Sequence, residues 1–368
     1  MDSRRLSKCL TLILCVILSL LSTSSHAANV GQLVIKNAGI ARTVSGAVDI
    51  IKTTKLTANG VQFLDQPSVE FMIDLDVKGK SVRLVPSDFH IETVESVQTG
   101  RETRTSFALI SKHDAFPQLI VFVDYFYEPK LKYMHKSVAI KPCKNCEHVT
   151  IKQVIVESMR IKRQFQPLLM DGSLAEESNY AVYDPESRKG LYFFINSPKG
   201  LVAIGGSYLT VAETTDAPLS KGFASARVTI GSAAGESSDI FVAYRDLILD
   251  VRWPDLARSK SFAAFKKRFA KQFSHCSFVG MRPFGGPVDG AAYGIGGQGF
   301  VLLLNSTDEP RKTILPLDRP ELRLAGEVKV TDWTDFESAV HVGIARVGET
   351  FNVDIPPNSF RIIGVNID

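Results

Sequence analysis

Glycines 294, 296 and 299 match the Gly-x-Gly-x-x-Gly pattern of dinucleotide-binding loops. Such a loop binds a pyrophosphate only where a strand precedes the glycines and a helix begins within them, because the helix N-terminus holds the phosphates. Here the turn-forming stretch 287–292 precedes the glycines, and the apolar run 300–304 follows them. The sequence therefore predicts a glycine-rich hairpin between two strands, and we expect no cofactor.

A second group with possible chemistry is the pair Cys143 and Cys146, which lies between two strand-like stretches. Redox activity would need a helix N-terminus beside the first thiol, and zinc would need four ligands. The sequence shows no such helix, and it offers only His148, His275 and Cys276 as further ligands. We expect a Cys143–Cys146 disulfide at a hairpin tip, as is typical of an oxidising compartment, and no metal site. The pairing of Cys276 stays open.

Three tyrosines could bind a sugar. Aromatic rings stack on pyranose faces, and nearby carboxylates or amides bond to the hydroxyl groups. Tyr125 and Tyr127 point to the same side of one strand because side chains alternate with a period of two, and Tyr133 follows across the next turn. These three residues are the candidate carbohydrate-binding platform. The alternative is that they are core aromatics with the hydroxyl group at the rim.

The first 27 residues have the pattern of a signal peptide. Arg4, Arg5 and Lys8 precede an apolar run that is too short to span a bilayer, and Ser25 and Ala27 are small residues at the cleavage position. We expect cleavage after Ala27, secretion to the extracellular space or the periplasm, and no membrane span. The net charge of +4 is small, and no basic tract is interleaved with aromatics, so nucleic acid is not an expected partner.

The rest of the chain is rich in short strand signals separated by turns. Residues 28–250 read as a large antiparallel sandwich, and the segment 239–244 is expected to be one of its strands. Phenylalanines at 262, 265, 269 and 273 predict one amphipathic helix in a linker, 251–279, that packs on a domain rather than on a membrane. Strand signals resume in 280–368, which we expect to be a smaller β-sandwich. The predicted fold class is all-β.

Two C-terminal stretches carry a family resemblance. The runs GFVLLLNSTDEP (299–310) and IPPNSFRII (355–363) resemble the C-terminal β-sandwich of alpha-galactosidase-type glycoside hydrolases. In that family a strand ends in an N-P-(S/T)-D-(E/K)-P turn, and here Ser306 replaces the proline. The stretches 123–127, 136–141 and 149–156 more weakly resemble the galactose-mutarotase-like supersandwich of the same hydrolases.

The resemblance implies where the catalytic groups of those hydrolases should be. They lie on a (β/α)8 barrel of ~250 residues between the two sandwiches, whereas only roughly 30 residues separate the two β modules here. No catalytic residue can therefore be carried over to this chain. The mutarotase-like part implies another possibility, because aldose epimerases of that fold use a histidine and a glutamate as general acid and base. The candidates are His90, His113, His135, His148, Glu92, Glu128 and Glu157, and none matches a family motif.

From the sequence we therefore expect a secreted, non-catalytic carbohydrate-binding or polysaccharide-handling protein. The expected partner is an oligo- or polysaccharide. One alternative is a carbohydrate-active enzyme of epimerase or lyase type with its site in the large sandwich. The other is a module that docks to a separate hydrolase or to another cell-surface protein.

Overall fold

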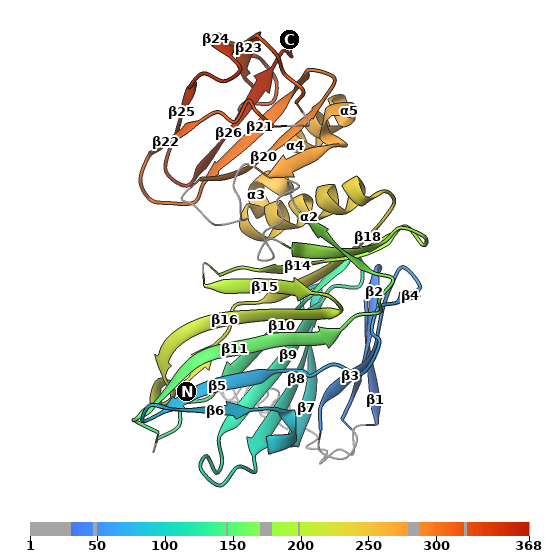
Figure 1. Ribbon diagram of the computed structural model, residues 1–368, viewed down its shortest axis with the longest axis vertical. Coiled ribbons are helices and arrows are strands. Elements are labelled where there is room, and N and C mark those ends of the chain that lie inside the picture. Colours follow the sequence, from blue (N-terminus) through green and yellow to red (C-terminus); the bar gives the residue numbers. More distant parts are fainter. Residues whose placement is uncertain are drawn as a thin grey trace, which may run out of the picture.

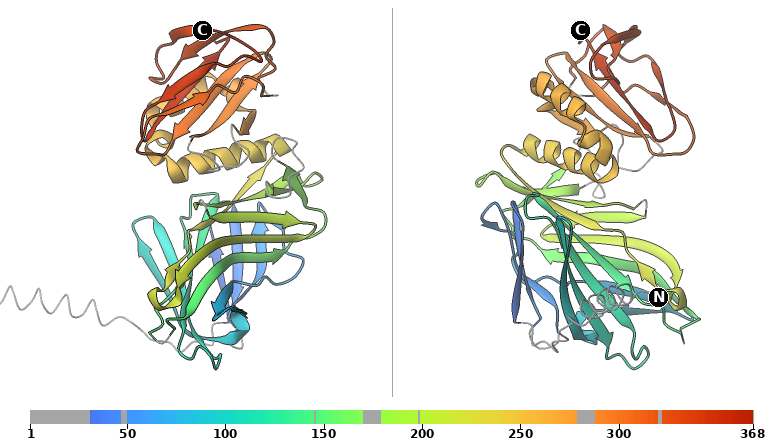
Figure 2. Two further views of the ribbon diagram at one scale, coloured as in Figure 1. Left: turned by 60° about the vertical axis from the view of Figure 1, so that its left-hand side comes forward. Right: turned by 180° about the vertical axis from the view of Figure 1, so that it is seen from behind.

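The computed structural model describes residues 31–46, 50–144, 146–169, 179–197, 199–278, 288–319 and 322–367. The expected signal peptide lies outside these ranges. A large β-sandwich forms one end of the molecule and a smaller one the other, and helix α2 (Ser237–Arg252) lies across the junction (Figures 1 and 2). Every strand pair among the described residues is antiparallel, as the pairings of the central strands illustrate. The predicted all-β fold is confirmed.

Three sheets build the large sandwich, and their buried side chains form one continuous core. The first sheet contains β1 (Gln32–Lys36), β2 (Ile40–Ser45), β3 (Lys52–Ala58) and β4 (Val61–Gln62). The second runs in the order β12 (Gln166–Leu169), β13 (Asn179–Asp184), β14 (Lys189–Ile195), β18 (Val228–Ala234), β10 (Tyr133–Ile140), β9 (Ile120–Tyr127), β8 (Glu102–Ser111) and β7 (Phe89–Thr99), and β17 (Phe223–Ala224) pairs with β10. The third runs β15 (Gly200–Gly205), β16 (Tyr208–Pro218), β11 (Val149–Arg160), β5 (Met72–Val77) and β6 (Lys80–Leu84). Short 3-10 turns lie at Pro86–Asp88 and Leu219–Lys221.

Strand β10 shows why these residues form a sheet. Its side chains alternate strictly between buried and partly exposed, with Met134, Lys136, Val138 and Ile140 on the buried side. A strand that covers a core on one face has this period of two. The other face, which begins with Tyr133 and His135, is the one that can reach a ligand.

Residues 239–244, which the sequence analysis expects to be a strand, are helical, so that prediction is wrong. The helix starts where the carboxylate of Asp239 accepts the backbone N–H of Glu236 at 2.7 Å, one half of a capping box. Its buried residues, Ile240, Tyr244, Leu247 and Ile248, recur at helical spacing and join the core of the large sandwich. A run of six residues is too short to distinguish the periodicity of a helix from that of a strand. The helical spacing of the apolar residues is visible only over the full length of α2.

The predicted linker helix is two shorter ones, α4 (Lys260–Arg268) and α5 (Ala270–Phe273), which follow α3 (Pro254–Ala257). The helical path breaks at Phe269, whose φ and ψ are −110° and 32°. Phe262, Phe265 and Phe273 are 2%, 2% and 6% exposed. The phenylalanine stripe therefore packs on a domain, as expected.

The smaller sandwich has a six-stranded sheet and a two-stranded one. The larger sheet runs β19 (Cys276–Phe278), β20 (Val288–Ile295), β21 (Gln298–Asn305), β26 (Ser359–Val365), β23 (Glu327–Asp332) and β24 (Val340–Arg346), and the smaller one pairs β22 (Arg311–Ile314) with β25 (Asn352–Ile355). One face of the six-stranded sheet packs Phe300 and Trp333 against the helical phenylalanines. The other face belongs to an aliphatic core that it shares with β25.

The glycine motif forms the predicted hairpin. Gly294 pairs with Gly299 across β20 and β21, and Gly296 and Gly297 make the turn with φ of 65° and 86°. Positive φ at both central turn positions favours glycine. The chain continues as strand β21 and not as a helix, so no helix N-terminus faces the loop.

Candidate functional site

A pocket of about 500 Å³ opens where the edge of the β9–β10 hairpin meets the end of α2. Strands β8, β9, β10 and β18 supply one side, and α2 with α3 supplies the other. The volume falls in the range of ~300–1,000 Å³ that is usual for small-molecule sites. Its polar and aromatic lining residues are Glu102, Tyr127, Glu128, Tyr133, His135, Asn196, Arg227, Thr229, Asp250 and Arg258.

Tyr133 joins the two sides of this pocket. Its hydroxyl group donates a hydrogen bond to Oδ2 of Asp250 on α2, and Oδ1 of the same carboxylate accepts from Nε of Arg258 at 3.0 Å. Burial and the hydrogen bond to Asp250 raise the pKa of Tyr133, so the phenol stays protonated and acts as a donor. Asp250 is therefore held by two donors from different elements.

His135 follows on the same face of β10. Its Nδ1 lies 2.7 Å from Oγ1 of Thr229, and its ring meets the ring of Tyr133 edge-on at 5.3 Å. Burial lowers the pKa of His135 to about 4, with a further contribution from the positive charge of Arg227, and Asp250 acts in the opposite sense. The imidazole is therefore neutral at pH 7 and presents one N–H donor and one acceptor nitrogen.

The cation of Arg227 also lines the pocket. Arg227 bonds to Oε2 of Glu102 at 2.9 Å, and its guanidinium lies over the ring of Phe126 at 3.8 Å. Stacking and ion pairing hold a guanidinium in one orientation. The pocket thus combines two tyrosines, a neutral histidine, an amide and paired charges.

The three tyrosines predicted as a platform do not share one surface. Tyr127 and Tyr133 both line the pocket. Tyr125 is 0% exposed, and its hydroxyl group donates to Glu70 in the core, which leaves no ring face for a sugar. The register also pairs Tyr127 with Met134, so Tyr133 projects from the opposite face of the sheet to Tyr125.

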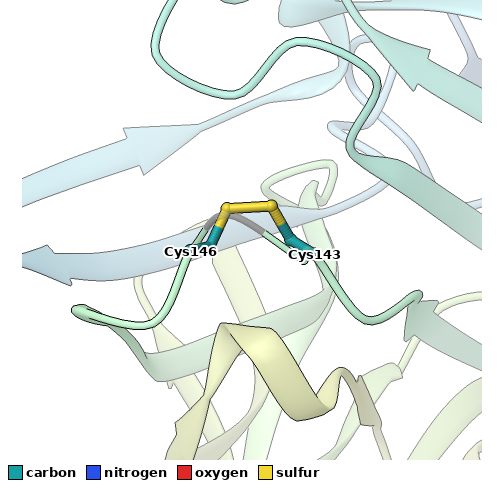
Figure 3. Close-up of a disulfide and its surroundings, with 2 residues drawn as sticks. All are labelled: Cys143 and Cys146. Carbon is teal, nitrogen blue, oxygen red and sulfur yellow. A yellow bond between two sulfur atoms is a disulfide. The ribbon is translucent and has the colours of Figure 1, made fainter.

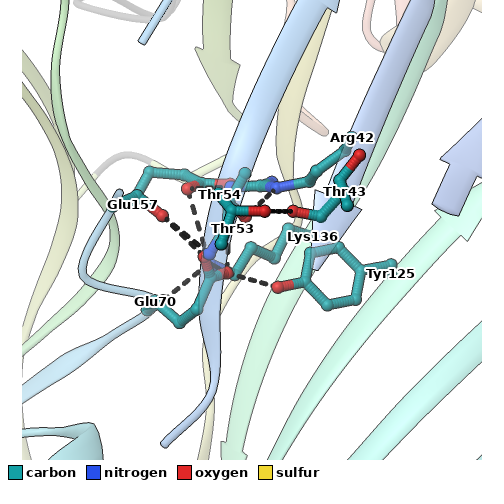
Figure 4. Close-up of polar contacts among 9 residues, drawn as sticks. Arg42, Thr43, Thr53, Thr54, Glu70, Tyr125, Lys136 and Glu157 are labelled. Atoms are coloured by element: carbon teal, nitrogen blue, oxygen red, sulfur yellow. Dashed lines mark hydrogen bonds and ion pairs between the residues drawn. The ribbon is translucent and has the colours of Figure 1, made fainter. Parts of the chain in front are cut away.

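Tyr125 belongs instead to a buried charge network that joins all three sheets of the large sandwich (Figure 4). Arg42 of β2 bonds to Glu157 of β11 through both carboxylate oxygens, at 2.6 Å and 2.7 Å, and Lys136 of β10 bonds to Glu70 at 2.7 Å. Burial alone would raise the pKa of Glu70, but Lys136 and Arg42 hold it well below its usual range. The four charged side chains are at most 1% exposed, so this network holds sheets together and is closed to solvent.

The acid–base candidates from the sequence are dispersed. His135 and Glu128 line the pocket, whereas Glu157 is buried in the network and His90 lies 3.6 Å from Glu92 at a separate, exposed position. Within the described ranges, no three histidine, cysteine or acidic side chains are grouped closely enough to hold a metal ion. The helices in those ranges include none with the length and apolar character needed to cross a bilayer.

The sequence analysis did not identify several residues that line the pocket. Glu102, Asn196, Arg227, Asp250 and Arg258 come from five separate parts of the chain. No motif relates them, since they come together only through the strand order β14-β18-β10-β9-β8 and the packing of α2 on β14 and β18. Sequence spacing alone gave no signal for them.

The expected disulfide is present. Cys143 and Cys146 are bonded in the loop between β10 and β11, with their Cα atoms 5.4 Å apart (Figure 3). The backbone N–H of Cys143 donates to the carbonyl of Leu219 at 3.2 Å. The loop is therefore attached to the turn before β17. Cys276 forms no disulfide among the described residues.

No protein-family model and no curated protein matches this sequence. Solved structures similar to the chain include a beta-arabinopyranosidase (TM-score 0.38, 8% identity, covering 90% of this chain and 100% of that one). They also include an alpha-N-acetylgalactosaminidase from Bifidobacterium bifidum (TM-score 0.41, 9% identity, 64% and 41%). An alpha-galactosidase from Lactobacillus brevis is a third (TM-score 0.38, 5% identity, 58% and 41%).

The chain therefore spans about two fifths of the length of the last two enzymes. The expected resemblance to part of alpha-galactosidase-type chains is confirmed to that extent. Similarity at these TM-scores and identities carries no information about the activity of this chain.

Proposed function

We propose that the pocket between β10 and α2 binds a carbohydrate without transforming it. The observation that carries this proposal is the presence of the Tyr133 ring beside planar hydrogen-bonding groups in one pocket of about 500 Å³. Sugar rings are recognised by aromatic faces together with groups that donate to and accept from hydroxyls. Asn196, His135 and the carboxylate of Asp250 supply both kinds of group. The sequence resemblance to modules of glycoside hydrolases supports the same ligand class.

A saccharide array with matched variants tests this proposal. Ala226 lines the pocket, and Ala226→Trp would fill it, whereas Ala263 is an exposed residue of α4 that lines neither this pocket nor its neighbour. We expect the wild type and Ala263→Trp to bind the same saccharides and Ala226→Trp to lose them while keeping its thermal transition. Equal binding by folded Ala226→Trp, or no binding of any saccharide by the wild type, would refute the proposal.

Acid–base catalysis on a sugar is the second candidate, and His135 with Glu128 in one pocket favours it. Catalysis by proton transfer is most efficient when the pKa of the group lies near the working pH. With the pKa of His135 at about 4, only about one imidazole in a thousand is protonated at pH 7, so it is a poor general acid. We therefore place binding first. Accelerated mutarotation of freshly dissolved glucose or galactose, lost in His135→Ala, would reverse that order.

We further propose that the protein works outside the cytoplasm. The signal-peptide pattern of residues 1–27 and the Cys143–Cys146 disulfide support this location. Its partner in this setting is an oligo- or polysaccharide. Docking to a separate hydrolase is the remaining alternative, and it would show as capture of a hydrolase by Ala226→Trp, in which saccharide binding is blocked.

A further inference from the structure

A second pocket, of about 580 Å³, adjoins the first. The two pockets share Tyr133 and Asp250 as lining residues. Because the hydroxyl of Tyr133 donates to Asp250, this hydrogen-bonded pair forms the partition between them. The second pocket continues along α2 toward the start of the helix, beside the end of β18.

The second pocket also has polar and charged lining residues. Its residues include Lys132, Tyr192, Ser232, Asp239, Ala243 and Asp246. The carboxylate of Asp246 bonds to Lys266 at 2.6 Å and is 45% exposed, so it can accept further hydrogen bonds. Tyr192 and Ser232 are only 3% and 1% exposed, so the groups that a ligand can reach beyond the partition are the exposed side chains of Lys132 and Asp239 and the carboxylate of Asp246.

We propose that the two pockets are consecutive subsites of one groove, and that the ligand is a saccharide chain of at least two units lying along α2. This inference rests on the proposed carbohydrate-binding function. Each pocket separately has the size of a small-molecule site, within ~300–1,000 Å³. Tyr133 and Asp250 would touch both units, one on each side of the partition, and would define where the glycosidic link crosses.

A saccharide that fills both subsites should bind more tightly than a monosaccharide. Once one unit is bound, the second unit is presented to its subsite at a high effective concentration, because the glycosidic bond tethers it. Lengthening the chain from one unit to two should therefore raise the affinity roughly tenfold or more. A single-site protein would show no such gain.

Titration calorimetry with defined chains tests the inference. The probes are the mono-, di- and trisaccharide series of galactose, glucose, mannose and xylose. Ala243→Trp and Ala234→Trp each fill the second pocket, from α2 and from the exposed end of β18 respectively, and neither residue lines the first pocket. Ala263→Trp, on the exposed face of α4, is the matched control.

In the wild type and the control, we expect the disaccharide of the recognised series to bind at least tenfold more tightly than the monosaccharide. In Ala243→Trp and Ala234→Trp, the monosaccharide should bind as in the wild type and the gain should disappear. Monosaccharide binding without a gain in the wild type, or a gain that survives in both filled variants, overturns the two-subsite inference and leaves the carbohydrate site intact. Absence of all binding in the wild type overturns both.

Discussion

Arg42 and Glu157 face each other in the middle of the large sandwich, joined by two hydrogen bonds of 2.6 Å and 2.7 Å, and neither side chain has any exposed surface. The pair bridges the first sheet and the third, and Lys136 reaches Glu157 from the second at 3.4 Å. Glu70 is the fourth charged residue of the network. The two positive and two negative side chains neutralise one another in a region that is closed to solvent.

Glu157→Gln should be strongly destabilising because it leaves a buried excess of positive charge on Arg42 and Lys136. Breaking such a pair by neutralising one partner costs about 3–5 kcal/mol in the free energy of unfolding. Urea denaturation followed by circular dichroism measures the change. The control is Asp74→Asn, which breaks the 2.6 Å pair with the half-exposed Arg83 and should cost at most about 1 kcal/mol. Similar losses in the two variants would contradict a special role for the buried pair.

His135 should make the protein less stable in mild acid. Its pKa is about 4 in the folded chain against 6.5 as a free side chain, so the unfolded chain binds more protons between those values. Stability from this group is therefore complete above pH 6.5 and is lost as the pH falls toward 4, by about 3 kcal/mol at most. We expect His135→Asn to flatten the fall in unfolding free energy between pH 7 and pH 4.5. An unchanged slope in folded His135→Asn would contradict this assignment.

Tyr133→Phe tests the link between β10 and α2. The variant keeps the ring but removes the donor to Asp250, and loss of a hydrogen bond to a charged, partly buried acceptor costs about 1.5–3 kcal/mol. Thermal unfolding should report a lower midpoint. Tyr208→Phe removes a hydroxyl from a side chain that is 59% exposed and should change the midpoint little. An unchanged midpoint in Tyr133→Phe would show that the contact does not hold the helix.

Gly231 accommodates the ring of Tyr192 on the neighbouring strand. A Cβ atom at Gly231 would lie 1.9 Å from that ring, so Gly231→Ala forces the tyrosine to move. Overpacking of this kind costs about 1–3 kcal/mol in unfolding free energy. The double variant Gly231→Ala, Tyr192→Leu should be more stable than the sum of the two single variants predicts. Simple additivity of the two losses would argue against a direct clash.

The sequence predicted the strands well and the site only in part. Period-two alternation and turn residues identified β9, β10 and the glycine hairpin, because these signals are local. The same alternation showed that Tyr125 and Tyr127 share a face, but it could not show that this face covers the core. In the structure, Tyr127 pairs with Met134, which lies on the core side of β10. Tyr133 and His135, on either side of Met134 in the sequence, therefore lie on the accessible side. Asp250 and Arg227 reach them only through tertiary packing.

Helix α2 gives residues to both hydrophobic interiors: Ile240, Tyr244 and Ile248 to the larger one, and Leu249 to the aromatic one of the smaller sandwich. Arg245, in the same helix, extends to Asp289 at the start of β20. Neither β module can lose its structure without exposing part of this helix. The two modules should accordingly denature together, in a single cooperative transition, and a cut made within the helix should destabilise both of them.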